Sequence, residues 1–240
     1  HASRAVPRAL DTLGLSAVQA SRHIAWDIGA GALARALARR LGVAVVATGF
    51  SRLVIDCNRH LDDPTSIVVA SDGDAVPGNV GLDEAARAAR TREIFEPYHA
   101  ALEAELEAVV ATSGAARPAL IAIHSFTDVF GGQARPWHCG VLWDLDPRLA
   151  VPLIAALRAV PGLVVGDNEP YSGRHPSDYT IETHAERHGR PHVCIEVRQD
   201  LLADDVGVAA WAERLGQPLE RLLSDATLYR DPVAAAGRGP

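Results

Sequence analysis

The 240-residue chain contains no methionine and no lysine, and all 23 of its basic residues are arginine. We attribute the arginine bias to GC-rich coding, because alanine is abundant as well. Because the chain starts at His1 without a methionine, we expect its natural N-terminus to lie further upstream. No stretch approaches the ~20 consecutive apolar residues of a membrane span. We therefore expect no transmembrane helix and no membrane partner.

Cysteine is also scarce, and Cys57, Cys139 and Cys194 show no C-x-x-C spacing. Their apolar neighbours predict small buried thiols in a reducing compartment, which indicates a cytoplasmic protein without disulfides. A net charge of −7 argues against a general nucleic-acid-binding surface. The hydrophobic content of 48% and the charged content of 22% are typical of a globular protein. We expect a single domain over residues 1–240.

Strand-like and helix-like segments alternate along the chain. The four-residue spacing of Leu33, Leu37 and Leu41 predicts an amphipathic helix over 29–41. Further helices are expected at 82–112, with Pro97 as a kink or break, at 147–159 and at 207–226; strands are expected at 43–49, 52–56, 119–125, 141–145, 162–168 and 192–197. Several of these strands are apolar on both faces. The pattern predicts an α/β fold with a mixed, mostly parallel sheet and helices on both faces.

Two of the apolar runs end in unexpected polar residues. "PALIAIHSFTD" leads into His124, and "PHVCIEVRQDL" carries Glu196 among aliphatic neighbours. In open α/β sheets the functional site lies beyond the carboxyl ends of the strands. These two residues therefore mark a candidate site at the rim of the sheet.

Parts of the sequence resemble zinc carboxypeptidases of the carboxypeptidase A type. In that family a strand ending "IHS" supplies a zinc-binding histidine, and a later "FELR"-like strand supplies the catalytic glutamate. A D-x-N-R string supplies the asparagine and the arginine that bind the substrate carboxylate. This chain has "IHS" at 123–125, "IEVR" at 195–198 and "DCNR" at 56–59.

A closer resemblance, to the N-formylglutamate amidohydrolase family, covers nearly the whole chain. It is carried by seven strings in order: "HAS…VP", "RHIAWDIGA", "SRLVIDCNR", "RPWHCGVLWD", "VGDNEPYSG", "YTIETHAERHG" and "PHVCIEVRQDL". The resemblance implies the zinc-carboxypeptidase-like hydrolase fold. It also implies a zinc-dependent amidohydrolase that removes a formyl group from an acidic amino acid such as N-formylglutamate, a small-molecule substrate.

The resemblance implies that His1 and His124 are zinc ligands. The first metal motif of carboxypeptidases is His-x-x-Glu, but position 4 here is Arg4, which cannot bind a cation. We expect Asp27, just ahead of the helix at 29–41, to supply the missing carboxylate. Two histidines, one carboxylate and an open fourth position form the ligand set of a catalytic zinc.

The remaining roles follow from the same family. Glu196 is expected to act as the general base toward the attacking water. N-formylglutamate carries two carboxylates, so an acidic protein must place arginines locally, where bidentate contacts favour Arg over Lys. Asn58 and Arg59 are the first candidates for substrate binding. Further candidates are Arg52, Arg135 and Arg198.

Each of these residues also has a structural interpretation. His124 could be a hydrogen-bonded core histidine, and Asp27 could cap the following helix. Glu196 could form a salt bridge with Arg198 or Arg59, and Asn58 with Arg59 could close a turn.

Three further functions remain open. The first is a peptidase or cell-wall amidase of the same fold. The second is a metal-free carboxylate-binding protein that has lost catalysis. Arg4 at the expected glutamate position supports this hypothesis. The third is a thiol hydrolase that uses Cys57 or Cys194. The oligomeric state is not predicted.

Overall fold

A computed structural model of the protein describes residues 1–114, 117–174 and 178–230. Its α-helices are α1 (Ala17–Ser21), α2 (Ala30–Leu41), α3 (Glu84–Arg90), α4 (Glu96–Ser113), α5 (Pro147–Arg158), α6 (Tyr179–His184) and α7 (Asp205–Leu223). Its strands are β1 (Ala70–Ser71), β2 (Asp74–Ala75), β3 (Leu120–Phe126), β4 (Val129–Phe130), β5 (Gln133–Ala134), β6 (Cys139–Leu142), β7 (Val165–Asp167) and β8 (His192–Arg198). Within the described residues, no helix is long and apolar enough to cross a membrane.

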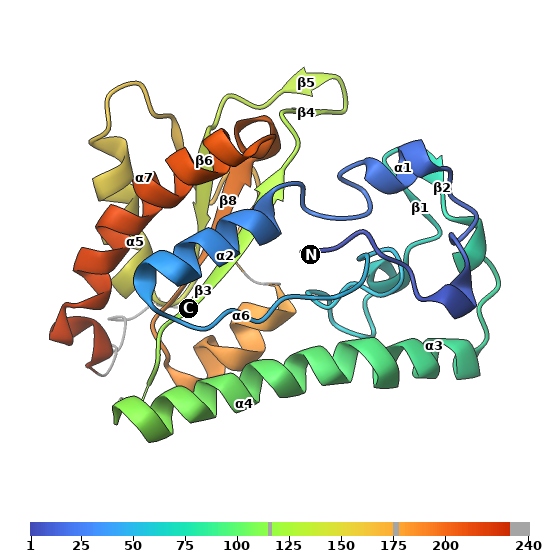
Figure 1. Cartoon of the computed structure of the whole chain (residues 1–240), viewed down its shortest axis with the longest axis horizontal. Helices are drawn as coiled ribbons and strands as arrows, with labels where there is room; N and C mark the ends of the chain where they lie inside the picture. The colour runs from blue at the N-terminus through green and yellow to red at the C-terminus, as the bar shows by residue number, and fades with distance from the viewer. Residues whose placement is uncertain (115–116, 175–177, 231–240) are drawn as a thin grey trace, which may run out of the picture.

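The central sheet has four strands in the order β3-β8-β6-β7. β3 pairs in parallel with β8, and β6 pairs in parallel with β7. The central pair of β6 and β8 is antiparallel. The sheet is therefore mixed and mostly parallel, as predicted. Two short hairpins, β1 with β2 and β4 with β5, lie outside it (Figure 1).

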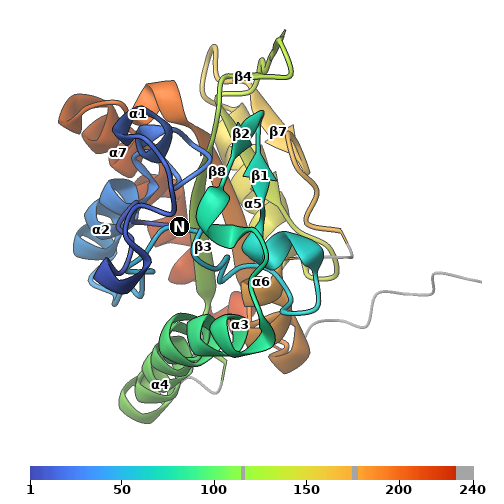
Figure 2. The same ribbon diagram turned by 90° about the vertical axis from the view of Figure 1, so that its right-hand side faces the viewer.

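Helices cover both faces of this sheet. Alternate residues of β8, among them Val193 and Ile195, pack with Leu33 of α2, Leu153 of α5 and Leu215 of α7 in the main core. The residues between them point to the other face, where Cys194 packs with Ile181 of α6. Figures 1 and 2 show α2 and α7 on one side of the sheet and α6 with α4 on the other. The alternation of side chains along a strand explains why β8 is apolar on both faces.

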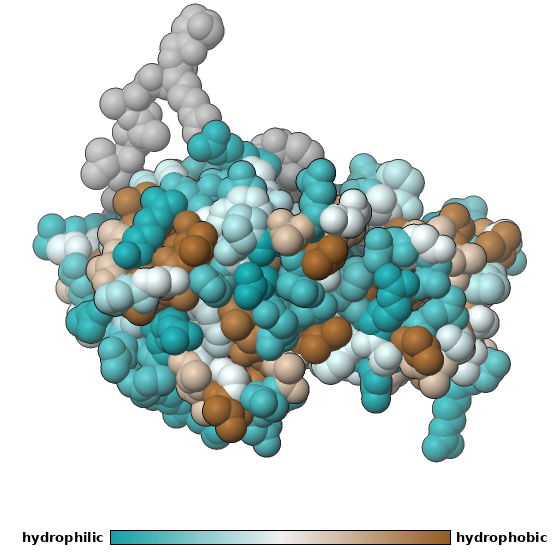
Figure 3. Space-filling view, turned by 90° about the horizontal axis from the view of Figure 1, so that it is seen from above, coloured by the Kyte–Doolittle hydropathy of each residue, from teal (hydrophilic) through white to brown (hydrophobic). Residues whose placement is uncertain are grey.

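The main core accounts for most of the large buried side chains. Leu33, Leu149, Leu153 and Leu215 are fully buried in it, and truncation of such a leucine to alanine costs about 2–5 kcal/mol. On the face seen in Figure 3, hydrophobic side chains form small separate groups among hydrophilic ones.

Two of the predicted strands, 43–49 and 52–56, do not form in the described part of the chain. Residues 43–48 are extended but pair with no strand in the described part of the chain. Residues 52–54 form a turn, and 55–56 have no regular secondary structure. Side chains bind carbonyl groups here: Asn79 donates to Leu53, and Arg90 donates to Val54. Apolar content alone therefore overstated the number of strands.

The long helix predicted for 82–112 is interrupted. A π-helical turn, Thr91–Phe95, separates α3 from α4, and Pro97 lies in the first turn of α4. Proline has no amide hydrogen, so the carbonyl group of Glu93 has no α-helical donor at position 97. The π-helical turn ends at Phe95, two residues before Pro97, and accommodates the missing hydrogen bond.

Candidate functional site

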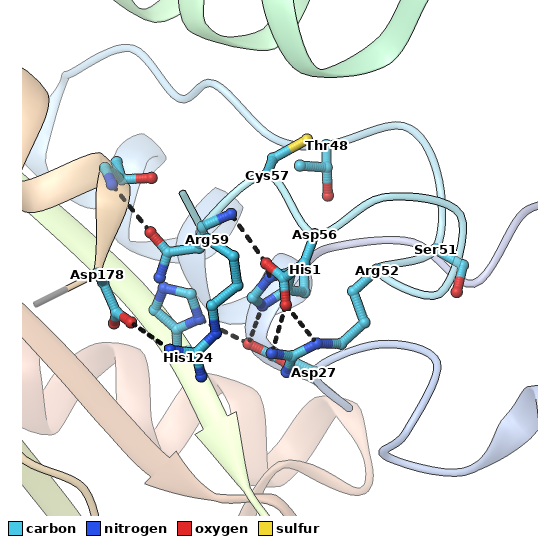
Figure 4. A network of polar contacts seen from close by, with 12 residues as sticks. His1, Asp27, Thr48, Ser51, Arg52, Asp56, Cys57, Arg59, His124 and Asp178 are labelled. Carbon is cyan, nitrogen blue, oxygen red and sulfur yellow. Dashed lines mark hydrogen bonds and ion pairs between the residues drawn. The ribbon is translucent and has the colours of Figure 1, made fainter. Parts of the chain in front are cut away.

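Three residues from distant parts of the chain form a group that could hold a metal ion. His1, Asp27 and His124 offer ligand atoms that all lie within 4.8 Å of one another. Nδ1 of His124 lies 2.7 Å from Oδ2 of Asp27, and Nδ1 of His1 lies 3.2 Å from the same oxygen. The two imidazole rings are 5.2 Å apart and approach edge to face. Figure 4 shows the three side chains directed toward one another.

Local backbone features bring the three residues together. His124 lies near the carboxyl end of β3, and the amide of Asp27 donates to the carbonyl group of His1 at 3.0 Å. Gly29 precedes α2 in the left-handed region (φ +77°), so the chain can turn sharply between Asp27 and the helix. A Cβ atom on Gly31 would lie 2.9 Å from the Cβ of Ala2. Glycine at that position therefore lets the N-terminal segment approach α2.

Asp56 orients the ring of His1. Oδ1 of Asp56 lies 2.6 Å from Nε2 of His1 and accepts its hydrogen. The same carboxylate accepts from the amide of Asn58 at 2.9 Å and from Arg52 at 2.7 Å and 3.0 Å. A carboxylate on the outer nitrogen of a metal-binding histidine fixes the tautomer and the ring orientation. His1 is therefore arranged to present Nδ1 to a cation.

Opposite charges stabilise this network in the ionised form. Burial and Arg52 oppose a positive charge on His1, but Asp56 and Asp27 outweigh them and raise its pKa to about 9. Burial opposes the charge of Asp27, yet His1 and His124 hold the pKa of this carboxyl well below its usual value. The pKa of Asp56 is likewise well below normal, because Arg52 and then His1 outweigh the effect of burial. Both carboxylates are thus ionised at neutral pH.

Glu196 faces the same region from the neighbouring strand. It is the register partner of His124 and is 7% exposed. Its Oε2 atom is buried and has no hydrogen-bond partner among the described residues. Burial, followed by the charges of Asp27 and Asp178, raises the pKa of this carboxyl well above its usual value. A buried carboxyl group without a partner, beside a group of potential metal ligands, is typical of an active site.

Asn58 and Arg59 lie next to this group. The carboxamide oxygen of Asn58 accepts from the amide of Thr180 at 3.1 Å, and so fixes the start of α6. The guanidinium group of Arg59 lies 3.9 Å from Asp178, beyond hydrogen-bond distance, and its side chain is 42% exposed. Figure 4 shows Arg59 beside Asp178 and His124. Among the described residues, no hydrogen bond occupies its guanidinium group, so its donors are available for a ligand.

The other three arginines predicted to bind substrate have different surroundings. Arg52 binds Asp56 and lies 3.3 Å from Asp27, so it holds the carboxylates of the network. Arg135 donates to the hydroxyl group of Tyr171 at 2.9 Å and lies over the rings of Tyr171 and Phe130. Arg198 binds its near neighbour Asp200 and the carbonyl group of Arg135. Arg59 is thus the predicted arginine whose guanidinium group lies beside His124.

Sequence reasoning assigned no role to Asp56 or Asp178. Asp56 opens the "DCNR" string, and a single sequence gives no sign that its carboxylate reaches back to His1. Asp178 lies in the loop before α6 and approaches Glu196 only in the folded chain. Both contacts depend on tertiary structure rather than on local spacing.

The cysteines do not favour a thiol nucleophile. All three are buried and free. Burial raises the pKa of Cys57 to about 12 and that of Cys194 well above its usual value. Each therefore carries a protonated thiol at neutral pH, which is a weak nucleophile.

Comparisons with known proteins show the family to which this chain belongs. The family model for N-formylglutamate amidohydrolase matches residues 1–203. The crystal structure of a gene product from Agrobacterium tumefaciens is similar, with a TM-score of 0.88 and 38% identity over 93% of this chain and 88% of that one. The crystal structure of N-formylglutamate amidohydrolase from Ralstonia eutropha JMP134 has a TM-score of 0.60, at 22% identity over 81% of this chain and 80% of that one. No curated protein matches significantly.

The family match spans most of the chain and includes His1, Asp27, His124 and Glu196. The name of the family indicates hydrolases that act on an amide bond. The resemblance seen in the sequence is therefore confirmed, and this chain belongs to the N-formylglutamate amidohydrolase family.

Proposed function

We propose that this protein is a zinc-dependent amidohydrolase with a carboxypeptidase-like fold. In this proposal it removes a formyl or similarly small acyl group from an acidic amino acid such as N-formylglutamate. The observation that carries the proposal is the convergence of His1, Asp27 and His124 beside the unpartnered carboxyl group of Glu196. Family membership supports the amide-bond chemistry.

The donor set suits zinc. Two imidazole nitrogens and one carboxylate are the ligands of many catalytic zinc sites, which keep a fourth position open. In the absence of an ion, the close contacts to Oδ2 of Asp27 need hydrogens on Nδ1 of both His1 and His124. A divalent cation would replace these protons, and Asp56 would continue to hold His1 from its outer nitrogen. Arg4 stands where the carboxypeptidase motif has a metal-binding glutamate, and it lies over the ring of Trp26. In this proposal Asp27 supplies the carboxylate in place of that glutamate.

Zinc, when bound, supplies the Lewis acidity that makes a water more acidic and polarises a carbonyl group. The protein residues then supply the proton transfers. Glu196 takes a proton from the attacking water and delivers it to the departing amide nitrogen. Its raised pKa favours the first of these transfers, because a carboxylate with higher proton affinity is the stronger base toward water.

Arg59 is the proposed anchor for a substrate carboxylate. A guanidinium group can bind a carboxylate through two parallel hydrogen bonds, and Arg59 has donors available beside His124. Asn58 lies between Arg59 and α6 and supports this position through Thr180. Arg135, which donates to the hydroxyl group of Tyr171, is the proposed contact of the second carboxylate.

The test is hydrolysis of N-formyl-Glu, N-formyl-Asp and N-acetyl-Glu by protein of measured zinc content. We expect N-formyl-Glu to be the best substrate. Glu196→Gln should retain zinc and lose turnover by at least ~100-fold, as expected for removal of a general base. Glu107→Gln makes the same chemical change at an exposed position of α4 and serves as the control. Undiminished turnover in Glu196→Gln would exclude this residue from the mechanism.

A further inference from the structure

The outer edge of β3 is unpaired. β3 pairs with β8 on one side and, in the described part of the chain, with no strand on the other. The amide of Leu120 donates to the carbonyl group of Pro191, next to β8. Backbone groups alternate between the two edges of a strand, so those of Ile121 and Ile123 point away from β8. This edge offers a ladder of hydrogen-bonding groups for another strand.

An extended apolar segment flanks the same space. Residues 43–48, "VAVVAT", follow α2 directly. Val43 is 53% exposed and Val45 is 43% exposed, which is unusual for β-branched residues in an otherwise strand-like sequence. The segment has the composition of a buried strand but pairs with no strand in the described part of the chain.

A slot separates these two segments. Residues 43–48 and 118–124 line a cavity of about 620 Å³. Ala34 and Leu37 of α2 line it on one face of the sheet, and Leu102 and Leu106 of α4 line it on the other. A space bordered by two extended segments and covered by helices on both faces has the surroundings of an interior strand in an α/β sheet.

The slot leads to His1. His1 and His124 both line it, at the end where β3 approaches the metal-ligand group. The amide of Ala2 donates to the hydroxyl group of Thr48 at 3.2 Å, so the segment 43–48 also runs toward this end. Figures 1 and 2 both place the N-terminus beside β3. A backbone joined to the amine of His1 can therefore enter the slot parallel to both flanking segments.

We propose that the slot accepts one extended, apolar strand joined to the amine of His1, between β3 and residues 43–48. This strand would pair with the outward backbone groups of Ile121 and Ile123 and would cover Val43 and Val45. With α2 as the crossover to residues 43–48, it would form a parallel βαβ unit, the standard connection in such sheets. His1 would then end one strand beside His124, which lies near the end of the next. This inference concerns the sheet and does not rest on the proposed activity.

The test is an N-terminal extension of the full chain by seven residues rich in Val and Ile. An extension of equal length made of Gly and Ser is the control. We expect the apolar extension to slow hydrogen exchange at the amides of Ile121 and Ile123 by at least ~100-fold. It should also raise Tm by at least ~5 °C, and the polar extension should change neither value. Equal exchange rates and equal Tm in the two extended chains would overturn the proposal. If the apolar extension causes aggregation, exchange is measured on the soluble fraction, and unprotected amides there would also overturn it.

A second variant tests the location. Ala34→Trp places a large ring in the slot from α2 and should abolish the gain in Tm produced by the apolar extension. Arg35→Trp, one position along and exposed, should leave that gain intact. If a fatty-acyl amino acid protects Ile121 and Ile123 but the extension does not, the slot binds a small molecule and the strand proposal is wrong.

Discussion

His124 on β3 and Glu196 on β8 are register partners in two adjacent parallel strands. Their side chains therefore leave the sheet on the same face and at the same level. One lies 2.7 Å from Asp27, and the other is buried without a hydrogen-bond partner among the described residues. Strand pairing thus places a potential metal ligand beside a potential general base. No local sequence spacing could do this, because 72 positions separate the two residues in the chain.

His124→Ala should weaken zinc binding by at least ~100-fold, because it removes one of three protein ligands. The fold should persist, since the ring of His124 is only partly buried. Calorimetric titration with zinc measures the affinity, and circular dichroism checks the fold. His188→Ala removes an exposed histidine and is the matched control. Equal zinc affinity in the two variants would remove His124 from the site.

Asp56→Asn should lower zinc affinity by roughly 10- to 100-fold, as is common when the residue behind a metal-binding histidine is changed. The physical reason is the 2.6 Å contact between Asp56 and Nε2 of His1, which an amide cannot match in charge. Asp63→Asn, on a nearby surface turn, makes the same change without contact to His1 and should bind zinc normally.

Arg59→Gln should raise KM for N-formyl-Glu by at least ~10-fold and change kcat less, because a charge-assisted contact to the substrate is lost. Steady-state kinetics separate the two parameters. Arg92→Gln, at a side chain that is 66% exposed, should leave both unchanged. A fall in kcat alone would assign Arg59 to the chemical step instead of to binding.

The free energy of unfolding should fall as the pH drops from about 6.5 toward about 4, because His99 takes up a proton when the chain unfolds. Burial lowers the pKa of His99 to about 4, and His184 adds to this effect, although the hydrogen bond to the carbonyl group of Cys57 opposes it. The unfolded chain, with an ordinary histidine pKa of 6.5, therefore binds a proton in this range that the folded chain does not. We expect a loss of roughly 5 °C in Tm from this group. His99→Gln should reduce this pH dependence, and His188→Gln should not; identical pH profiles for all three proteins would contradict the assignment.

Much of the fold follows from periodicity. The leucine spacing of α2 and the apolar runs of β3 and β8 correctly predicted these elements, because each element buries an apolar face or is buried on both faces. Residues 43–49 were predicted as a strand for the same reason. A strand also needs a partner for its backbone, and composition says nothing about that partner. Residues 52–56 were also predicted as a strand, but their backbone has other partners. Asn79 and Arg90 donate to the carbonyl groups of Leu53 and Val54, which a sheet would otherwise pair.

The site was predictable only in part. Family resemblance pointed to His1, His124 and Glu196, and the missing glutamate at position 4 led to Asp27, which indeed joins the two histidines. Asp56 and Asp178 were not predicted, because each acts through a contact made across the folded chain. The sequence placed Arg59 first among the substrate-binding arginines and kept Arg52 as a further candidate. The structure distinguishes them, since Arg52 is bound by Asp56 and Arg59 is not.

Zinc titration of the wild-type chain and of Asp27→Ala tests the central claim most directly. Asp27 joins both histidines through a single oxygen, so the account predicts one zinc ion per wild-type chain. It predicts an affinity at least ~100-fold lower in Asp27→Ala. A wild-type chain that binds no zinc, or an Asp27→Ala variant that binds it equally well, would contradict the account.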